Sequence, residues 1–238
     1  MTGLRNVAVV LAGGMGTRVG RDVPKQLITI AGKPIIEHTI AAMQRSPLID
    51  EIVVIMAAGY LNEVRALVLD GGYDKVTQIL PGAATRNGST AAALAALGER
   101  ECNVLLHDAA RPLVSQEIIA ANVAALADHQ AVHTAITSAD TVIQVDQNRN
   151  RIADVLPRHL LRRGQTPQSF RLSTIRAAYA EAARDPAFTA TDDSTVVLRY
   201  LPGVEIAVVD GHERNLKITG PLDVAIAEML LGQEAGVD

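Results

Sequence analysis

The chain has 238 residues, of which 48% are hydrophobic and only 3% aromatic, with one cysteine, no tryptophan and a formal net charge of −4. This composition excludes a disordered or fibrous chain, a disulfide-stapled one, and the strongly basic surface of a general nucleic-acid binder. The length predicts one domain, 1–238, and the many Ala, Val, Ile and Leu residues predict aliphatic strands covered by helices.

Apolar, β-branched runs alternate along the chain with longer segments of helical period. A strand expected over 6–11 is followed by a helix over 34–46, in which Ile36, Ile40 and Met43 share one face. The alternation continues with strands over 51–56, 75–80 and 103–107 and helices over 61–70, 87–97 and 116–129. Repeated strand–helix units predict a Rossmann-like, three-layer α/β fold with a mostly parallel sheet, in which ligands bind at the carboxyl ends of the strands.

The rhythm changes after an apolar run at 131–138. The next segment, DTVIQVDQNRNRIADVL, has two short extended runs around a polar turn and predicts a protruding β-arm at about 139–160. Because an isolated two-stranded hairpin is marginal in water, we expect a second copy of the chain to pack on this arm. Helices over 172–184, about 192–199 and about 222–231, with a strand over 205–210, complete the predicted elements.

The first strand runs directly into a glycine-rich, basic loop, LAGGMGTRVGRDVPKQ. Its glycines, Gly13, Gly14 and Gly16, are compatible with a tight turn whose backbone N–H groups point at an anion. Arg18 and Lys25 add positive charge to the same loop. The loop alone fits either a polyphosphate site or a flexible turn with solvated charges.

Two familiar phosphate-binding motifs do not fit this loop. A Walker A motif needs Lys-Ser/Thr after its last glycine, whereas Gly20 is followed by Arg21 and Asp22. The dinucleotide fingerprint needs glycine or alanine at the position of Val19. An NAD-dependent enzyme is therefore disfavoured.

Other polar segments follow strands at the same edge of the predicted sheet. In HDAARP, Asp108 can hold Mg²⁺ or a ribose hydroxyl and Arg111 can grip a phosphate, with a helix cap and a surface ion pair as the plainer alternatives. In GAATRNGS, small residues let a flat base approach the backbone, and Ser89 can cap or donate at a helix start. His107 has no nucleophile or metal-ligand set nearby, which favours a structural role.

Together with ADT, GQTPQSF, TDD and NLKIT, these segments occur in the order and spacing of a known enzyme family. From about Val7 to Leu231 the chain resembles the CTP-dependent cytidylyltransferases of polyol phosphates, which include the ribitol-5-phosphate and 2-C-methyl-D-erythritol 4-phosphate enzymes. Each segment alone is a weak signal, whereas the ordered set is specific.

The resemblance implies a role for each matching residue. The catalytic charges would be Arg18, Lys25 and Lys217. Nucleotide binding would fall to Ala12, Gly13, Gly14, Gly16, Gly82, Ala83, Ser89 and Asp108, with Mg²⁺ near Asp108. The alcohol phosphate would be bound by Arg111, Thr141, Arg158, Thr166 and Thr191. In the family the arm reaches into a second subunit, so some of these contacts would cross the interface of a homodimer.

The resemblance also implies the reaction. A phosphate oxygen of the polyol phosphate attacks the α-phosphorus of CTP, releasing pyrophosphate and leaving a CDP-alcohol. Because the second pKa of a phosphate monoester is about 6, the nucleophile is mostly a dianion at neutral pH and needs no general base. Catalysis would then depend on positioning and on fixed positive charge.

Two local spellings, LAGG and GQTPQSF, favour ribitol 5-phosphate as the alcohol, and with it the synthesis of cell-wall polymers such as teichoic acid. Methylerythritol phosphate, and with it isoprenoid synthesis, is the alternative. A sugar-1-phosphate nucleotidyltransferase and a non-catalytic nucleotide-binding module are remoter alternatives. Because no apolar stretch reaches the roughly 20 residues of a membrane span and the first residues lack the pattern of a signal peptide, we expect a cytoplasmic protein without membrane or nucleic-acid partners.

Overall fold

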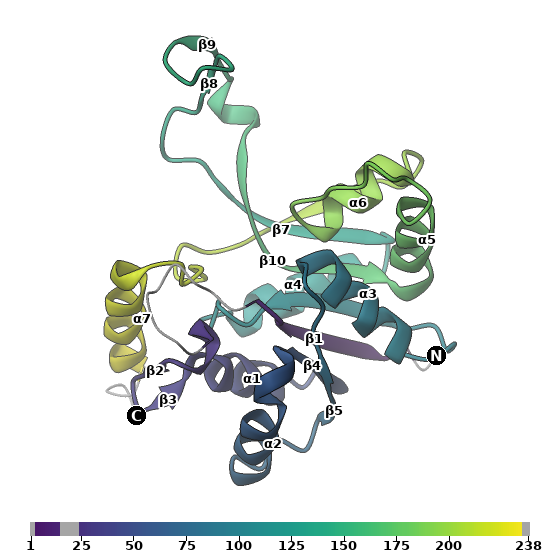
Figure 1. Ribbon diagram of the computed structural model, residues 1–238, viewed down its shortest axis with the longest axis vertical. Coiled ribbons are helices and arrows are strands. Elements are labelled where there is room, and N and C mark those ends of the chain that lie inside the picture. The colour runs from purple at the N-terminus through teal and green to yellow at the C-terminus, as the bar shows by residue number, and fades with distance from the viewer. Residues whose placement is uncertain (1–2, 15–23, 235–238) are drawn as a thin grey trace.

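The computed structural model describes residues 3–14 and 24–234, and seven of its strands form the central sheet in the order β11-β7-β10-β6-β1-β4-β5 (Figure 1). These strands are β1 (Asn6–Ala12), β4 (Glu51–Met56), β5 (Val76–Pro81), β6 (Asn103–Asp108), β7 (Ala131–Thr137), β10 (Arg162–Arg171) and β11 (Ile206–Asp210). All are parallel except β10, which runs antiparallel to β6 and β7. The mostly parallel sheet expected from the sequence is confirmed.

Helices cover both faces of the sheet. The helices on one face are α1 (Ile35–Arg45), α2 (Leu61–Asp70) and α4 (Gln116–Ala125), and those on the other are α3 (Arg86–Ala96), α5 (Leu172–Ala182) and α6 (Asp193–Tyr200). Successive side chains of a strand point to opposite faces. In β1, Val10 therefore packs in the core beneath α1, α2 and α4, and Val9 packs in the core beneath α3, α5 and α6. Strands β1, β4 and β6 are buried along their whole length, so the three-layer prediction is confirmed.

A smaller apolar cluster lies at the edge of the molecule. It joins the short hairpin of β2 (Thr29–Ile30) and β3 (Lys33–Pro34), which follows the 3-10 helix η2 (Lys25–Leu27), to the last helix α7 (Pro221–Glu234). Ile28, Ile218 and Ala227 are buried in it together. The cluster therefore holds the residues just after Lys25 against those just after Lys217.

Side-chain caps fix where several helices begin. Thr85, Ser115 and Asp192 each accept a hydrogen bond from a backbone N–H in the first turn of α3, α4 and α6 respectively. Ser89, offered from the sequence as a possible cap, lies inside α3, one turn beyond the actual cap. Helix α4 ends at 125, short of the expected 129.

The turn that ends α4 has a polar partner in β10. Arg171 donates from Nη2 to the carbonyl of Leu126 at 2.5 Å, while the Arg171 N–H is bonded to the Gln130 carbonyl. These bonds take up carbonyl groups beyond the last helical residue, and they fix the chain where it turns into β7.

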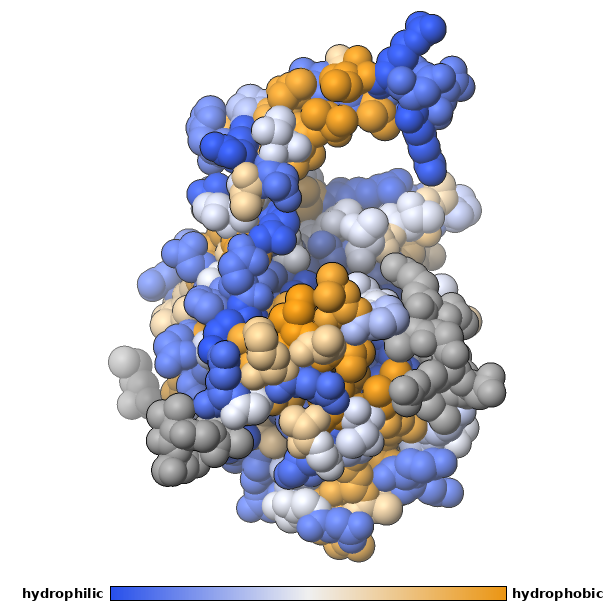
Figure 2. Space-filling model, turned by 90° about the vertical axis from the view of Figure 1, so that its left-hand side faces the viewer, coloured by the Kyte–Doolittle hydropathy of each residue, from blue (hydrophilic) through white to orange (hydrophobic). Residues whose placement is uncertain are grey.

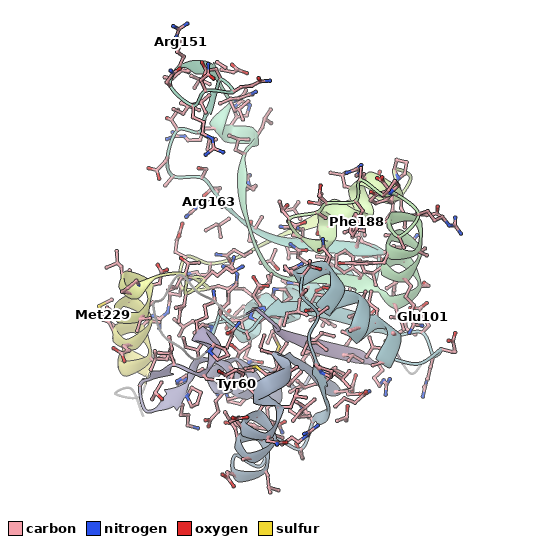
Figure 3. All side chains as sticks on the ribbon, in the orientation of Figure 1. Tyr60, Glu101, Arg151, Arg163, Phe188 and Met229 are labelled. Atoms are coloured by element: carbon pink, nitrogen blue, oxygen red, sulfur yellow. The ribbon has the colours of Figure 1, made fainter. Side chains whose placement is uncertain are left out.

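The predicted arm stands away from the sheet on extensions of β7 and β10 (Figure 1). It consists of β8 (Ile143–Val145), the antiparallel β9 (Ile152–Val155) and a 3-10 turn η4 (Arg158–Leu160). Arg151 lies at its tip and Arg163 at its base (Figure 3). Figure 2 shows apolar side chains gathered on the arm; its exposed apolar residues are Val142, Ile143, Val145, Ile152, Val155 and Leu160.

Candidate active site

A cavity of about 320 Å³ opens where β1, β5 and β6 end. Its lining is made up of Leu11, Gly13, Gly14, Lys25, Gln26, Ala83, Ala84, Thr85, Arg86, Ser89, Asp108, Ala110 and Lys217. A larger cavity of about 940 Å³ lies between α1, α4, β11 and α7, and none of the predicted site residues lines it. We therefore place the candidate active site in the smaller cavity.

At one wall of the smaller cavity, the backbone at Gly13 packs closely against the backbone at Gly82. A Cβ on Gly82 would lie 2.8 Å from the Cα of Gly13, and a Cβ on Gly13 would lie 2.6 Å from Oγ of Ser89. Ser89 in turn accepts a hydrogen bond from the N–H of Ala83 and donates one to the carbonyl of Thr85. Only glycine allows the two loops to approach this closely, and the resulting wall exposes main chain to a ligand.

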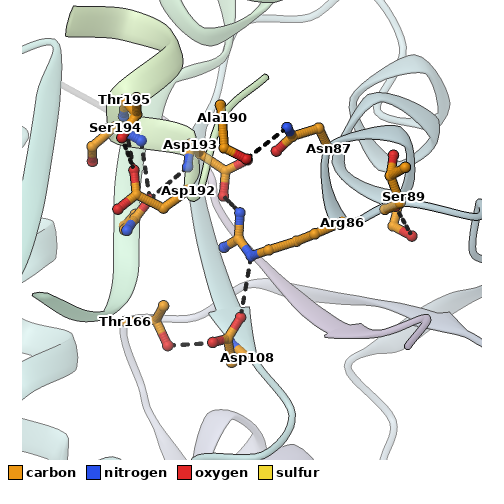
Figure 4. A network of polar contacts seen from close by, with 12 residues as sticks. Arg86, Asn87, Ser89, Asp108, Thr166, Ala190, Asp192, Asp193, Ser194 and Thr195 are labelled. Atoms are coloured by element: carbon orange, nitrogen blue, oxygen red, sulfur yellow. Dashed lines mark hydrogen bonds and ion pairs between the residues drawn. The ribbon is translucent and has the colours of Figure 1, made fainter. Parts of the chain in front are cut away.

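Asp108, the last residue of β6, lies between two cations, Lys217 and Arg86, and Figure 4 shows its contact with Arg86. Its Oδ2 is 2.7 Å from Nζ of Lys217, and its Oδ1 is 3.5 Å from Nε of Arg86. Burial alone would raise the pKa of this carboxyl, but the two cations outweigh burial and hold the pKa well below its ordinary value. Asp108 is therefore a carboxylate at neutral pH and cannot serve as a general acid.

The two predicted catalytic lysines that the structure describes come from opposite ends of the chain, and both line the cavity that contains Asp108. The N–H of Ile218 donates to the Ala110 carbonyl at 2.8 Å, which fixes the segment carrying Lys217 beside Asp108. Lys25 donates from Nζ to the Ile218 carbonyl at 2.9 Å. Both lysines line the cavity, so the main chain around Ile218 sets their spacing.

The cavity concentrates positive charge in an acidic protein. Lys25, Arg86 and Lys217 line it together with Asp108, whereas the whole chain has a formal net charge of −4. Several like charges that line one cavity add their attraction for an anion. The arrangement suits a polyphosphate with a flat base against the glycine wall.

Comparison with known proteins decides the family. A family model described as 2-C-methyl-D-erythritol 4-phosphate cytidylyltransferase matches residues 6–233. The chain belongs to this family. It is a CTP-dependent nucleotidyltransferase, as the ordered segments of the sequence indicate.

Individual relatives agree with the family model. The 2-C-methyl-D-erythritol 4-phosphate cytidylyltransferase of Thermobifida fusca is 50% identical over 232 residues, covering 95% of this chain and 93% of the relative. A bifunctional ribulose 5-phosphate reductase/CDP-ribitol pyrophosphorylase of Haemophilus influenzae is 36% identical over 228 residues, covering 95% of this chain but 48% of the relative. The crystal structure of 4-diphosphocytidyl-2C-methyl-D-erythritol synthase from Anaerococcus prevotii superimposes with a TM-score of 0.85 at 29% identity, covering 96% of this chain and 99% of the other.

Thr166, predicted to bind the alcohol phosphate, is buried beneath the site, where it is hydrogen-bonded to His107 and to Asp108; Figure 4 shows the contact with Asp108. Nε2 of His107 lies 3.1 Å from the Arg111 carbonyl, which can only accept, so Nε2 carries the ring proton. The other ring nitrogen therefore accepts from the Thr166 hydroxyl at 3.0 Å, while Thr166 accepts from the N–H of Asp108. Burial lowers the pKa of His107 to about 4, so the ring is neutral and structural, as the sequence indicates.

Arg111 is not brought into the cavity. Its side chain is buried, and its guanidinium donates to the carbonyls of Asn215 at 2.7 Å and Gly164 at 3.4 Å. Desolvation lowers the pKa of this guanidinium despite the nearby Asp108. The structure thus shows Arg111 joining three segments beneath the site, and its contact with a phosphate stays a prediction.

The other residues expected to bind the alcohol phosphate lie outside the cavity wall. Thr141 and Arg158 belong to the arm, where Arg158 donates to the carbonyl of Ala139 at 3.1 Å. Thr191 is exposed, directly before the cap of α6.

The residues predicted to bind the nucleotide, and the predicted catalytic Arg18, differ in where they lie. Gly13, Gly14 and Ala83 line the cavity, as Ser89 does. Ala12 is buried at the end of β1, and Gly82 forms the glycine wall. Gly16 and Arg18 lie outside the described residues.

Two charged residues of the site were missed from the sequence, Arg86 and Asp193. Nη1 of Arg86 lies 2.6 Å from Oδ2 of Asp193, which is fully buried. Burial opposes the positive charge of Arg86, but Asp193 and Asp108 together raise its pKa above the ordinary value. Arg86 lies in GAATRNGS and Asp193 lies in TDD, two segments that carry the family resemblance. Their charge within these segments was the sequence signal that could have marked them as site residues.

Proposed function

We propose that the protein transfers CMP from CTP to 2-C-methyl-D-erythritol 4-phosphate, releasing pyrophosphate. The observation that carries this proposal is the group of cations, Lys25, Arg86 and Lys217, around Asp108 at the edge of the sheet. The choice of 2-C-methyl-D-erythritol 4-phosphate as the alcohol phosphate is supported by the family model and by the Thermobifida relative.

Methylerythritol phosphate replaces the ribitol 5-phosphate preferred from the sequence. The spelling GQTPQSF lies in β10, where Gln165, Thr166 and Gln168 are buried and bonded to other segments of the protein. The spelling LAGG includes Gly13, whose missing side chain is required by contact with Ser89. The described contacts of both segments are thus with other parts of the protein, so the choice of alcohol rests on the family model and the relatives.

The proposed mechanism relies on charge and not on proton transfer. A phosphate dianion attacks the α-phosphorus of CTP in line, the bond to the β-phosphate oxygen breaks, and pyrophosphate leaves. Asp108 is paired with Lys217, and His107 is buried and neutral, so neither supplies a base. Lys25, Lys217 and, as proposed from the sequence, Arg18 offset the charge that builds around the phosphorus.

Mg²⁺ is the proposed cofactor. Within residues 3–14 and 24–234 there is no group of three or more His, Cys, Asp or Glu side chains that could hold a metal ion. Mg²⁺ is commonly held by one or two carboxylates together with substrate phosphates, and the ionised Asp108 on the cavity wall fits such a ligand. Bound with CTP, the ion would neutralise phosphate charge.

A homodimer formed through the arm is the proposed assembly. The arm exposes Ile152, Val155 and Leu160 by 63%, 54% and 72%, and a two-stranded hairpin needs additional packing to be stable. Thr141 and Arg158 would then contact the alcohol phosphate in a second copy's site. The described part of the chain has no helix with the length and hydropathy to cross a membrane; the cytoplasmic location stays a prediction.

Pyrophosphate release tests the proposed function. The purified chain is assayed with CTP and Mg²⁺ against 2-C-methyl-D-erythritol 4-phosphate and ribitol 5-phosphate in parallel, with ATP, GTP and UTP as nucleotide controls. We expect kcat/KM for methylerythritol phosphate to exceed that for ribitol phosphate at least tenfold. Equal or reversed values would overturn the choice of alcohol.

A further inference from the structure

Arg86 connects two sides of the site that are 107 residues apart in sequence. It is the first residue of α3, at the end of the loop that supplies the glycine wall, and it lines the cavity. Its guanidinium reaches Asp193 at the start of α6 and Asp108 at the end of β6. One side chain therefore contacts the carboxylate of the nucleotide site and the segment that carries Thr191.

Asp193 is built as a fixed anchor for this guanidinium. It is fully buried, and its Oδ1 accepts a hydrogen bond from the hydroxyl of Tyr179 at 2.7 Å. Its N–H donates to Oε1 of Gln168 in β10 at 3.0 Å. Because Tyr179 of α5 holds the carboxylate and Gln168 of β10 holds the backbone of the same residue, Asp193 is fixed in place and Arg86 takes its position from it.

A second bond ties the same two segments. Asn87 donates from its side-chain amide to the carbonyl of Ala190 at 3.1 Å (Figure 4). The start of α3 and residues 190–193 are thus joined at two consecutive positions. Thr191 lies between the two attachment points, exposed and free of regular structure.

We propose that Asp193, through Arg86, is a positioning residue that sets the distance between the nucleotide wall and residues 190–193, and thereby the affinity for the alcohol phosphate. Asp193 is fully buried and does not line the cavity. The proposal rests on the proposed function for the identity of the alcohol phosphate, but the physical coupling of the two segments can be measured without any substrate.

Amide hydrogen exchange of the free protein tests the coupling directly. In Asp193→Asn we expect exchange to increase at least fivefold in both 83–89 and 190–195, because the ion pair that joins them is weakened. The matched control is Arg199→Gln, which removes a 2.8 Å ion pair with Asp185 near the other end of α6. This control should leave 83–89 unchanged. Faster exchange in Asp193→Asn confined to 190–195 would overturn the proposal.

Steady-state kinetics tests the consequence for the site. We expect Asp193→Asn to raise KM for methylerythritol phosphate about tenfold while KM for CTP stays within about twofold. Adding Asp193→Asn to Arg86→Gln should cause no further rise, because both changes remove one interaction. Equal rises in both KM values, or a fully additive double variant, would indicate general loosening and overturn the proposal.

Two further arrangements keep the outcome decisive. If Asp193→Asn does not fold, Arg86→Lys provides the second variant, because a single ammonium cannot span both carboxylates as the guanidinium does. Arg86→Lys should also increase amide exchange in 190–195. Unchanged exchange in 190–195 would contradict the coupling. If the wild-type chain turns over another alcohol phosphate, the proposed function fails, whereas the exchange result still decides the coupling.

Discussion

Nζ of Lys25 donates to the main-chain carbonyl of Ile218 at 2.9 Å, joining residues 193 positions apart. The adjacent Lys217 forms its ion pair with Asp108 at 2.7 Å. The two lysines are therefore linked through one short segment, residues 217–218. A shift of this segment would move the positive charge of both side chains.

Lys25→Ala should lower kcat by about 10² or more, the usual effect of losing one fixed donor that stabilises transition-state charge. The measurement is single-turnover CMP transfer, with thermal unfolding to show that the variant is folded. Near wild-type turnover in a folded variant would remove Lys25 from catalysis.

Arg158→Ala should raise KM for the alcohol phosphate with little effect on KM for CTP, because the residue belongs to the arm and not to the nucleotide cavity. If the site is shared between copies, mixing Arg158→Ala with Lys217→Ala should restore activity. Half of the molecules would be mixed dimers, each with one intact site, so about a quarter of wild-type activity is expected. No recovery after subunit exchange would contradict a shared site.

Stability should fall between pH 6.5 and pH 4 because of His107. Burial lowers its pKa in the folded protein from 6.5 to about 4, so in this window the unfolded chain binds a proton that the folded protein does not. Stability from this group is complete above pH 6.5 and is lost as pH falls, by about 3 kcal/mol at pH 4. Urea unfolding at several pH values measures the slope, which His107→Asn should flatten; an unchanged slope would assign it to other groups.

Thr166→Val should destabilise the fold by about 1–3 kcal/mol, because it leaves the N–H of Asp108 and the acceptor nitrogen of His107 without their partner. Thr166→Ser keeps the hydroxyl and serves as the control. The free energy of unfolding distinguishes the two variants, and equal values for Val and Ser would show that the hydroxyl is not structural.

The repeated strand–helix pattern was sufficient to predict the central sheet, because β1, β4 and β6 are continuous apolar runs with Ala-rich or amphipathic helices between them. Strand β10 was missed as a strand. Its segment GQTPQSF has the polar composition of a loop, yet it is buried because Gln165 and Gln168 find hydrogen-bond partners on distant segments.

The site shows the same limit. Asp108 follows an apolar strand, whereas Lys25 and Lys217 were predicted from the ordered set of motifs, and all three residues line one cavity. The pairing of Arg86 with Asp193 depends on how α3 and α6 pack on one face of the sheet, which no local pattern shows. The bonds from Arg111, a predicted phosphate ligand, to the carbonyls of Gly164 and Asn215 join segments far apart in the sequence and could not be read from HDAARP.

The small apolar cluster that contains Ile28 and Ile218 is completed by Ala227 of α7, the last helix of the fold. A ribosome must therefore release almost the entire chain before the two lysine segments can settle against each other, even though the sheet strands β1, β4 and β6 are synthesised much earlier. Strands β1, β4 and β6 are thus available for pairing well before the segment that carries Lys217 is made, so the cavity that contains both lysines is completed late in synthesis.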